Sequence, residues 1–226
     1  MNLRRAFTGR RTTVGAVLGM ASLLTLAPTM ARATPSVPPV AAANELPPVG
    51  EVDHEPLAGD ITFHLNGQTC QARVAGSVEE DVVAQDAAHE TDTVTERHLH
   101  MGGSEACGNR RATGGTITIE QNDVDVDAKS LLRLTQKFPP RYEQVMVLSF
   151  TMTIDQPDAK NGQTRAAREP LVLTTKNPAQ LIGQLTQFPP KGDLYQLQNP
   201  VDLVLPDDPD TTIATIQKFP VKVGGL

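Results

Sequence analysis

The residues of this chain that are best suited to chemistry are two histidines one residue apart, His98 and His100. On a strand, residues two apart project from the same face about 7 Å apart. Imidazole is a common ligand of zinc and copper, and His89 lies a short distance upstream. The hypothesis is a zinc or copper site formed by His98, His100 and His89. The surrounding segment is hydrophilic, so the pattern favours a solvated strand edge over a metal site.

Three alternating acids, Asp123, Asp125 and Asp127, match the first half of a calcium-binding loop. The match then fails, because Ala128 stands where the turn glycine belongs and Leu134 where the bidentate glutamate belongs. An alternating strand with acids on its wet face explains this spacing better than a calcium site does.

Two cysteines, Cys70 and Cys107, are the whole cysteine content of the chain. Outside the cell, a pair without a competitor is most simply a disulfide. Paired metal-binding thiolates are the alternative, but neither cysteine stands in a Cys-x-x-Cys spacing. We therefore expect a disulfide between Cys70 and Cys107.

Elements that could position these groups are mainly strands. Asn66-Gly67 separates two alternating runs, which is the strongest short signal for a β-hairpin. A two-residue loop there predicts three cross-strand pairs: Leu65 with Gln68, Phe63 with Cys70, and Ile61 with Ala72. This register puts the apolar residues on one face and points Cys70 into the core.

Further short strands follow, punctuated by glycine and proline. The clearest has apolar residues at strict period two over 146–154. The remaining predicted strands cover residues 91–100, 114–120, 124–127, 171–175, 181–188, 201–205 and 213–223. Segment 77–88 is predicted to be a short helix or irregular, because Ser77 and Glu80 have the spacing of a capping box. The pattern predicts one all-β domain, an antiparallel sandwich or barrel.

A Phe-Pro step recurs three times in the second half of the chain, at Phe138, Phe188 and Phe219. A strand that buries its last residue and is ended by proline explains the repeat, because proline has no amide proton for the ladder. The functional alternative is that these three rings line one apolar pocket. In both cases we expect the rings to be mostly buried.

The first 33 residues have the pattern of a bacterial export signal: four early arginines, an apolar run, and Ala31-Arg32-Ala33 as a cleavage site. Residues 34–58 are proline-rich and predict a flexible linker, which leaves 59–226 as the folded domain. We expect cleavage after Ala33, a secreted extracellular product and no membrane span after cleavage. Loss of five arginines changes the net charge from −6 to −11, which argues against nucleic acid as a partner.

No catalytic signature is present, and the chain has no tryptophan and only two tyrosines. The composition therefore predicts a secreted, non-catalytic binding or interaction module for an unknown extracellular ligand or protein. An alternative is a small enzyme of the cyclase or isomerase type that uses the interior of a β-barrel as an apolar chamber. A third interpretation is an extracytoplasmic metal-binding protein that uses the His98 region.

Overall fold

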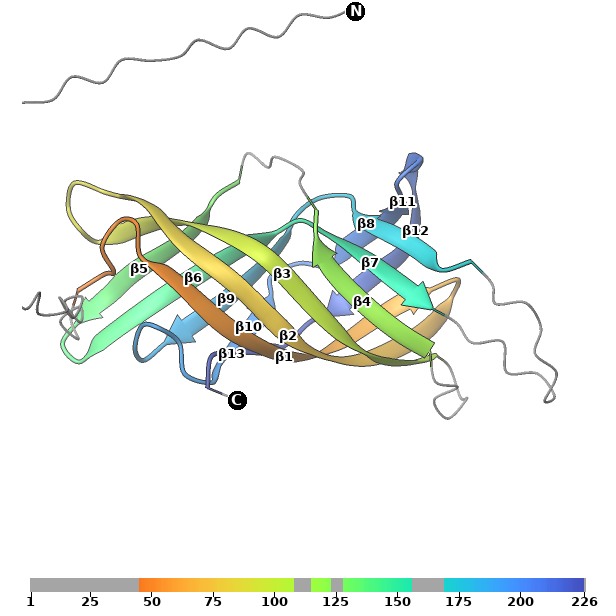
Figure 1. Ribbon diagram of the computed structural model, residues 1–226, viewed down its shortest axis with the longest axis horizontal. Coiled ribbons are helices and arrows are strands. Elements are labelled where there is room, and N and C mark those ends of the chain that lie inside the picture. Colours follow the sequence, from red (N-terminus) through yellow and green to blue (C-terminus); the bar gives the residue numbers. More distant parts are fainter. Residues whose placement is uncertain (1–44, 108–114, 123–127, 156–168, 226) are drawn as a thin grey trace, which may run out of the picture. The chain divides into compact units, whose positions relative to one another are not determined.

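The computed structural model describes residues 45–107, 115–122, 128–155 and 169–225. All of them belong to the unit Val40–Leu226. They form one 13-stranded antiparallel sheet, and no helix occurs among them (Figure 1). The strands are β1 (Val52–Leu65), β2 (Gln68–Gln85), β3 (Thr91–Cys107), β4 (Gly115–Gln121), β5 (Ser130–Lys137), β6 (Pro140–Leu148), β7 (Phe150–Asp155), β8 (Leu171–Thr175), β9 (Ala179–Leu185), β10 (Asp193–Leu197), β11 (Val201–Leu205), β12 (Asp208–Lys218) and β13 (Val221–Val223). The all-β fold class is confirmed.

Two additional pairings, β12 with β1 and β3 with β5, close this sheet into two rings. The first ring, which we call the apolar barrel, contains β1, β2, β3, β4, β7, β8, β11 and β12. The second, which we call the polar barrel, contains β1, β2, β3, β5, β6, β9, β10 and β13. The long strands β1, β2 and β3 are therefore shared, and each barrel uses a different half of them (Figure 1).

Elsewhere, the chain passes from one barrel to the other through a short break between two consecutive strands. β6 of the polar barrel ends at Leu148, and β7 of the apolar barrel begins at Phe150. The strict alternation over 146–154 therefore belongs to two strands, and the prediction of a single one is wrong. Similarly, Pro220 separates β12 from β13, so that the predicted strand 213–223 is divided between the two barrels.

The hairpin predicted around Asn66-Gly67 is confirmed in its register, with Phe63 opposite Cys70. Asn66 and Gly67 both have positive φ, as this turn requires. The helix predicted over 77–88 is wrong, because β2 continues to Gln85. Val78 and Val82 are buried there, and pairing with strands on both sides outweighs a local capping signal.

Strand β1 begins at Val52, so residues 52–58 of the predicted linker belong to the sheet. Leu57 is buried within this segment, although the prolines of residues 34–58 had made the stretch resemble a flexible linker. The predicted strand 124–127, together with Asp123, lies outside the described residues, as does the predicted signal peptide. The other predicted strands lie within β3, β4, β8, β9 and β11, to within a few residues at their ends.

The predicted disulfide is present: Cys70 and Cys107 are bonded and lie opposite each other on β2 and β3. Cys70 is buried in the apolar barrel, beside Phe63. Such a bond is consistent with an oxidising extracellular location. Among the described residues, no helix has the length and apolar character needed to cross a membrane.

Candidate functional site

Four acidic side chains are buried in the polar barrel, on the three strands that it shares with its neighbour. Glu55 comes from β1, Glu80 from β2, and Asp92 and Glu96 from β3. Glu80 is 2% exposed and Glu96 4% exposed. Buried acids without a cationic partner are costly and uncommon, so a cluster of them indicates a functional site.

The register of β2 and β3 brings two of these acids together. Glu80 lies directly opposite Glu96, and both side chains point inward. A β-bulge follows at Arg97 and His98, where two successive residues face outward and the alternation of β3 then resumes with Leu99 inside. The bulge allows one strand to place Glu96 in the polar barrel and Leu99 and Met101 in the core.

A hydrogen-bonded chain connects Glu80 to the opposite wall of the polar barrel. Tyr195 Oη donates to Gln144 Oε1 at 2.5 Å, and Gln144 Nε2 donates to Glu80 Oε1 at 2.5 Å. Gly183 makes room for this arrangement, because a Cβ there would lie 2.7 Å from the Tyr195 ring. This series of hydrogen bonds fixes Oε1 of Glu80 and leaves its other oxygen, Oε2, without a partner.

Glu96 is held in a similar way, by one of its two oxygens. Ser130 Oγ donates to Glu96 Oε2 and accepts a hydrogen bond from the Val147 amide at 2.8 Å. Glu96 Oε1 is buried and has no hydrogen-bond partner. One oxygen therefore orients the carboxyl group, and the other has no partner among the described residues.

Burial gives the acids unusual affinities for protons. It raises the pKa of Glu96 to about 8 against the opposing hydrogen bond from Ser130. Burial, and then the charges of Glu96 and Glu55, raise the pKa of Glu80 well above its usual range. Burial likewise raises the pKa of Glu55 to about 7 and that of Asp92 to about 6. Groups that titrate near neutral pH are suited to proton transfer.

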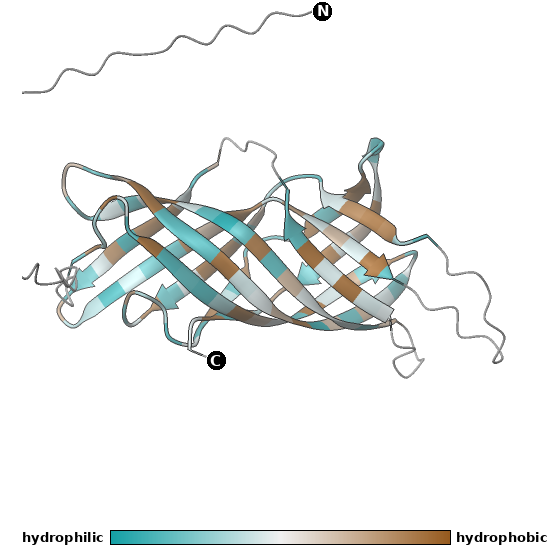
Figure 2. Ribbon diagram, in the orientation of Figure 1, coloured by the Kyte–Doolittle hydropathy of each residue, from teal (hydrophilic) through white to brown (hydrophobic). Residues whose placement is uncertain are grey.

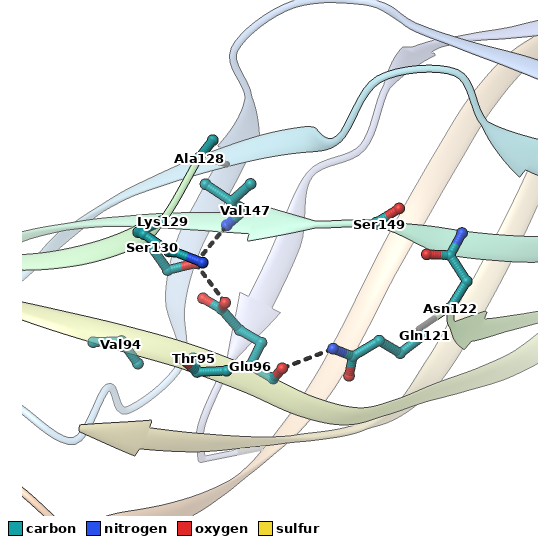
Figure 3. Close-up of a pocket in the computed structure, with 10 residues that line it drawn as sticks. All are labelled: Val94, Thr95, Glu96, Gln121, Asn122, Ala128, Lys129, Ser130, Val147 and Ser149. Atoms are coloured by element: carbon teal, nitrogen blue, oxygen red, sulfur yellow. Dashed lines mark hydrogen bonds between the residues drawn. The ribbon is translucent and has the colours of Figure 1, made fainter. Parts of the chain in front are cut away.

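A pocket of about 150 Å³, which we call the seam pocket, is lined in part by Glu96 and lies between the two barrels (Figure 3). At this point β3 changes its partner strand, from β5 in its first part to β4 in its second. Gln121 satisfies the backbone at this change, since it donates to Glu96 O at 2.7 Å and accepts from the Leu99 amide at 3.3 Å. Residues that line the pocket are Val94, Thr95, Glu96, Gln121, Asn122, Ala128, Lys129, Ser130, Val147 and Ser149.

Asn122 is a second pocket residue with an unpartnered oxygen. Its Nδ2 donates to Thr174 Oγ1 at 2.9 Å, but its Oδ1 is buried and has no hydrogen-bond partner. Of the four buried side-chain atoms of the described residues that lack a partner, those of Asn122 and Glu96 belong to side chains that line this pocket. Unsatisfied buried polar groups call for an explanation, and a ligand is one.

The histidines predicted to share a metal ion are each paired with a different side chain. His98 Nδ1 lies 3.5 Å from Glu79 Oε2, and His100 Nδ1 lies 3.5 Å from Glu120 Oε1. His89 Nδ1 is hydrogen bonded to Gln85 Oε1. His98 and His100 do border the same shallow surface depression, yet the bulge turns one toward β2 and the other toward β4.

The three phenylalanines of the Phe-Pro repeat have different surroundings. Phe219 is buried, Phe188 is half-buried, and Phe138 is 86% exposed at the turn between β5 and β6. The expectation that all three are buried is wrong for Phe138, because a short hairpin turn lies outside the barrel wall. Phe138 therefore cannot line an interior pocket with the other two.

Sequence reasoning missed the buried acids. One local signal was available: in β2, Glu80 stands at an inward position between Val78 and Val82, where an apolar residue would be expected. Glu96 carried no such signal, because its inward position depends on the bulge at His98 and on pairing with β5.

Comparison with known proteins identifies a similar fold. No family model matches the chain, and no curated protein matches it in sequence. Among solved structures, DynF from the dynemicin biosynthesis pathway of Micromonospora chersina superimposes with a TM-score of 0.59 at 18% sequence identity. The match covers 79% of this chain and 82% of DynF.

This likeness corrects the main functional expectation. A non-catalytic binding module was predicted, but the fold is shared with a protein of a biosynthetic pathway. The alternative expectation was a small enzyme that uses the interior of a β-barrel as an apolar chamber. The chamber differs from the apolar one expected, because its buried groups include Glu55, Glu80, Asp92 and Glu96.

Proposed function

We propose that the protein is an enzyme of the isomerase or cyclase type that moves a proton on a small neutral carbonyl compound bound at the seam pocket. The observation that carries the proposal concerns Glu96. Its side chain lines this pocket, and its Oε1 is buried and has no hydrogen-bond partner. The shared fold with DynF, a protein of a biosynthetic pathway, supports an enzymatic role.

In the proposed reaction, ionised Glu96 takes a proton from a carbon next to the carbonyl group of the substrate. The electron pair of the broken C–H bond moves onto the carbonyl oxygen, which gives an enolate. Return of the proton to a different carbon completes an isomerisation. A raised pKa makes Glu96 a stronger base than an ordinary carboxylate.

Size and polarity of the pocket define the substrate class. A cavity of about 150 Å³ is comparable to one that accepts benzene, so it holds about one six-membered ring. The unpartnered Asn122 Oδ1 calls for a hydroxyl or N–H donor on the ligand. A neutral ligand fits best, since the surrounding buried acids disfavour an anion.

The proposal is tested by hydrogen exchange of carbon acids. The purified protein is incubated in D₂O with a panel of cyclic enones and hydroxyketones, and deuterium incorporation is followed by mass spectrometry. We expect exchange above the buffer rate for hydroxylated members, and a rate that rises with pH to a plateau above about 8. Glu96→Gln should reduce the exchange rate by about 100-fold or more.

Glu105→Gln is the matched control, because Glu105 is a buried acid of the apolar barrel, away from the seam pocket. The Glu105→Gln variant should catalyse deuterium exchange at the wild-type rate. The proposal is overturned if no compound exchanges above the buffer rate, or if the Glu96 and Glu105 variants are equally active.

The proposed enzyme acts outside the cell, after cleavage of the signal peptide at Ala33, and the disulfide supports this location. An intact mass of the culture supernatant protein that begins at Thr34 is the expected result. A cell-bound product that retains Met1 would contradict export.

A further inference from the structure

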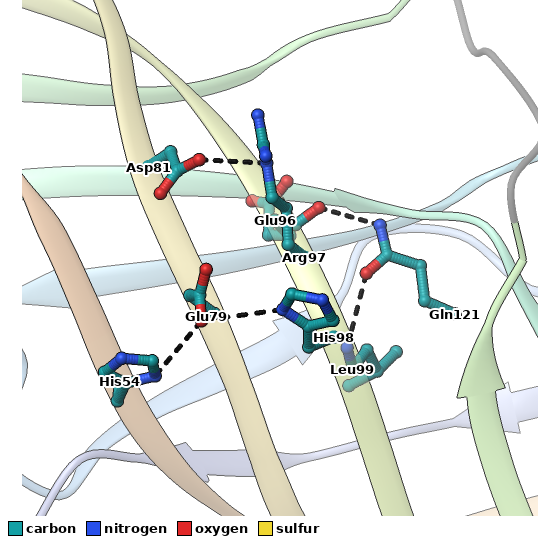
Figure 4. A network of polar contacts seen from close by, with 8 residues as sticks. All are labelled: His54, Glu79, Asp81, Glu96, Arg97, His98, Leu99 and Gln121. Atoms are coloured by element: carbon teal, nitrogen blue, oxygen red, sulfur yellow. Dashed lines mark hydrogen bonds and ion pairs between the residues drawn. The ribbon is translucent and has the colours of Figure 1, made fainter. Parts of the chain in front are cut away.

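A second group of ionisable side chains lies on the outer surface of the shared strands. His54 from β1, Glu79 from β2 and His98 from β3 occupy three adjacent strands, with Glu79 between the two histidines (Figure 4). None of the three lines the seam pocket. Both imidazoles face solvent, whereas the Glu79 side chain is only 23% exposed.

Two of the three distances within this group are those of a metal site. His54 Nδ1 and His98 Nδ1 lie 3.4 and 3.5 Å from the same atom, Glu79 Oε2. In a tetrahedral zinc site with bonds of about 2.0–2.1 Å, neighbouring ligand atoms are separated by about 3.4 Å. Two of the three ligand-to-ligand edges therefore already have the required length.

The backbone of His98 is a second, independent observation. Its φ is 53°, a left-handed conformation that non-glycine residues adopt rarely and at some cost. This conformation forms the bulge that turns His98 toward Glu79 rather than toward β4. The adjacent acid Asp81 is neutralised by Arg97 at 2.9 Å, which leaves Glu79 as the carboxylate for the two imidazoles.

The geometry points to a zinc site formed by His54 Nδ1, Glu79 Oε2 and His98 Nδ1, with water in the fourth position. Two imidazoles and one carboxylate form a known ligand set for zinc with an open position. Closing the third edge requires the two exposed rings to rotate toward each other. In the described part of the chain, the one group with all ligand atoms within 4.8 Å is Cys70, Glu105 and Cys107, whose sulfurs are already bonded to each other.

Calorimetric titration of the full chain with ZnCl₂, purified without a polyhistidine tag, tests this site. We expect one zinc ion per chain, no binding of Mg²⁺, and weaker zinc binding at acidic pH, because ligation requires neutral imidazole. His54→Ala and His98→Ala should each weaken binding by at least about tenfold. With Co²⁺ as the probe, each substitution should also remove the visible absorption of a tetrahedral complex.

His100→Ala is the matched control, because His100 also faces a glutamate at 3.5 Å on the same outer surface. It should bind zinc as the wild type does. Equal affinity of the wild type and the His54 and His98 variants, or an equal loss in the His100 variant, would overturn the site. Circular dichroism of each variant establishes that it is folded before it is titrated.

Discussion

The two barrels are built on the same three long strands, but their interiors differ. The apolar barrel is filled by Phe63, Met101, Ile119, Phe150 and other apolar side chains, and hydrophobic residues recur along its strands β4, β7 and β8 (Figure 2). The polar barrel also has buried apolar side chains, such as Leu132, Met146 and Leu181, but it contains the buried acids, Gln144 and Tyr195 in addition. One half of the shared strands therefore supplies stability, and the other half carries groups that cost stability and are suited to chemistry.

The difference shows how a single chain can hold costly buried acids. Strands β1, β2 and β3 run through both barrels, so the packing of their apolar halves also fixes the direction of their polar halves. The disulfide joins β2 and β3 within the apolar half. Glu80 and Glu96 are thus positioned by strands that are also held in the core of the apolar barrel.

The largest expected effect comes from truncating the apolar barrel. Phe63 is fully buried opposite Cys70, so Phe63→Ala leaves a cavity in a packed core. We expect the free energy of unfolding to fall by about 3–5 kcal/mol, as measured by denaturant titration. Phe138→Ala is the control and should change it by less than about 0.5 kcal/mol, because that ring is on the surface. Similar losses in both variants would contradict the assignment of the stable core.

A smaller effect is expected from the hydrogen-bonded chain of the polar barrel. Tyr195→Phe keeps the ring over Gly183 but leaves Gln144 Oε1 without its donor. An unsatisfied buried acceptor should cost about 1–3 kcal/mol in the free energy of unfolding. A loss as large as that of Phe63→Ala would mean that the polar barrel contributes as much stability as its neighbour, which would break the comparison.

The apolar barrel was also the easier half to predict from the sequence. Its hairpin has a two-residue turn and strict alternation, so Phe63 and Cys70 could be paired from local information. The same local reasoning failed in the polar half of β2, where Ser77 and Glu80 resembled a helix cap. There the strand is stabilised by neighbours distant in sequence, and a local pattern does not contain them.

The candidate site could not be assembled from the sequence for a related reason. Glu96, Ser130 and Gln144 come together only because β3 pairs with β5 and because β6 lies beside β5. The closure of a ring depends on pairings between distant strands, and no spacing in the chain encodes them. Of the predicted metal ligands, His98 alone belongs to the zinc site inferred from the structure, since the bulge separates it from His100.

The buried acid Glu96 of the polar barrel should also make the free energy of unfolding depend on pH. Burial raises the pKa of Glu96 from 4.5 to about 8, so between these values the folded state binds its proton more tightly than the unfolded state does. The stability that Glu96 contributes is therefore fully present below about pH 4.5 and is lost as the pH rises through about 8.

Glu96→Gln should remove this dependence. The free energy of unfolding of the wild type should fall relative to that of the variant by up to about 1.4 kcal/mol per pH unit over this window. Denaturant titrations at several pH values give the two curves. Phe138→Ala provides the control, because it changes an exposed ring and no titratable group, and it should run parallel to the wild type. Parallel curves for Glu96→Gln as well would contradict a raised pKa at Glu96.

The smallest expected effect concerns the bulge at which β3 passes from one barrel to the other. His98 has a φ of 53°, which glycine adopts without strain, so His98→Gly relieves a local cost. Glycine also has more freedom to lose on folding, by about 0.5–1 kcal/mol, and this offsets most of the gain. We expect the free energy of unfolding without zinc to rise by about 0–1 kcal/mol, while the proposed zinc binding is lost. A clear destabilisation in the absence of metal would instead show that the contact of His98 with Glu79 stabilises the bulge, and that the left-handed backbone serves the fold rather than a ligand.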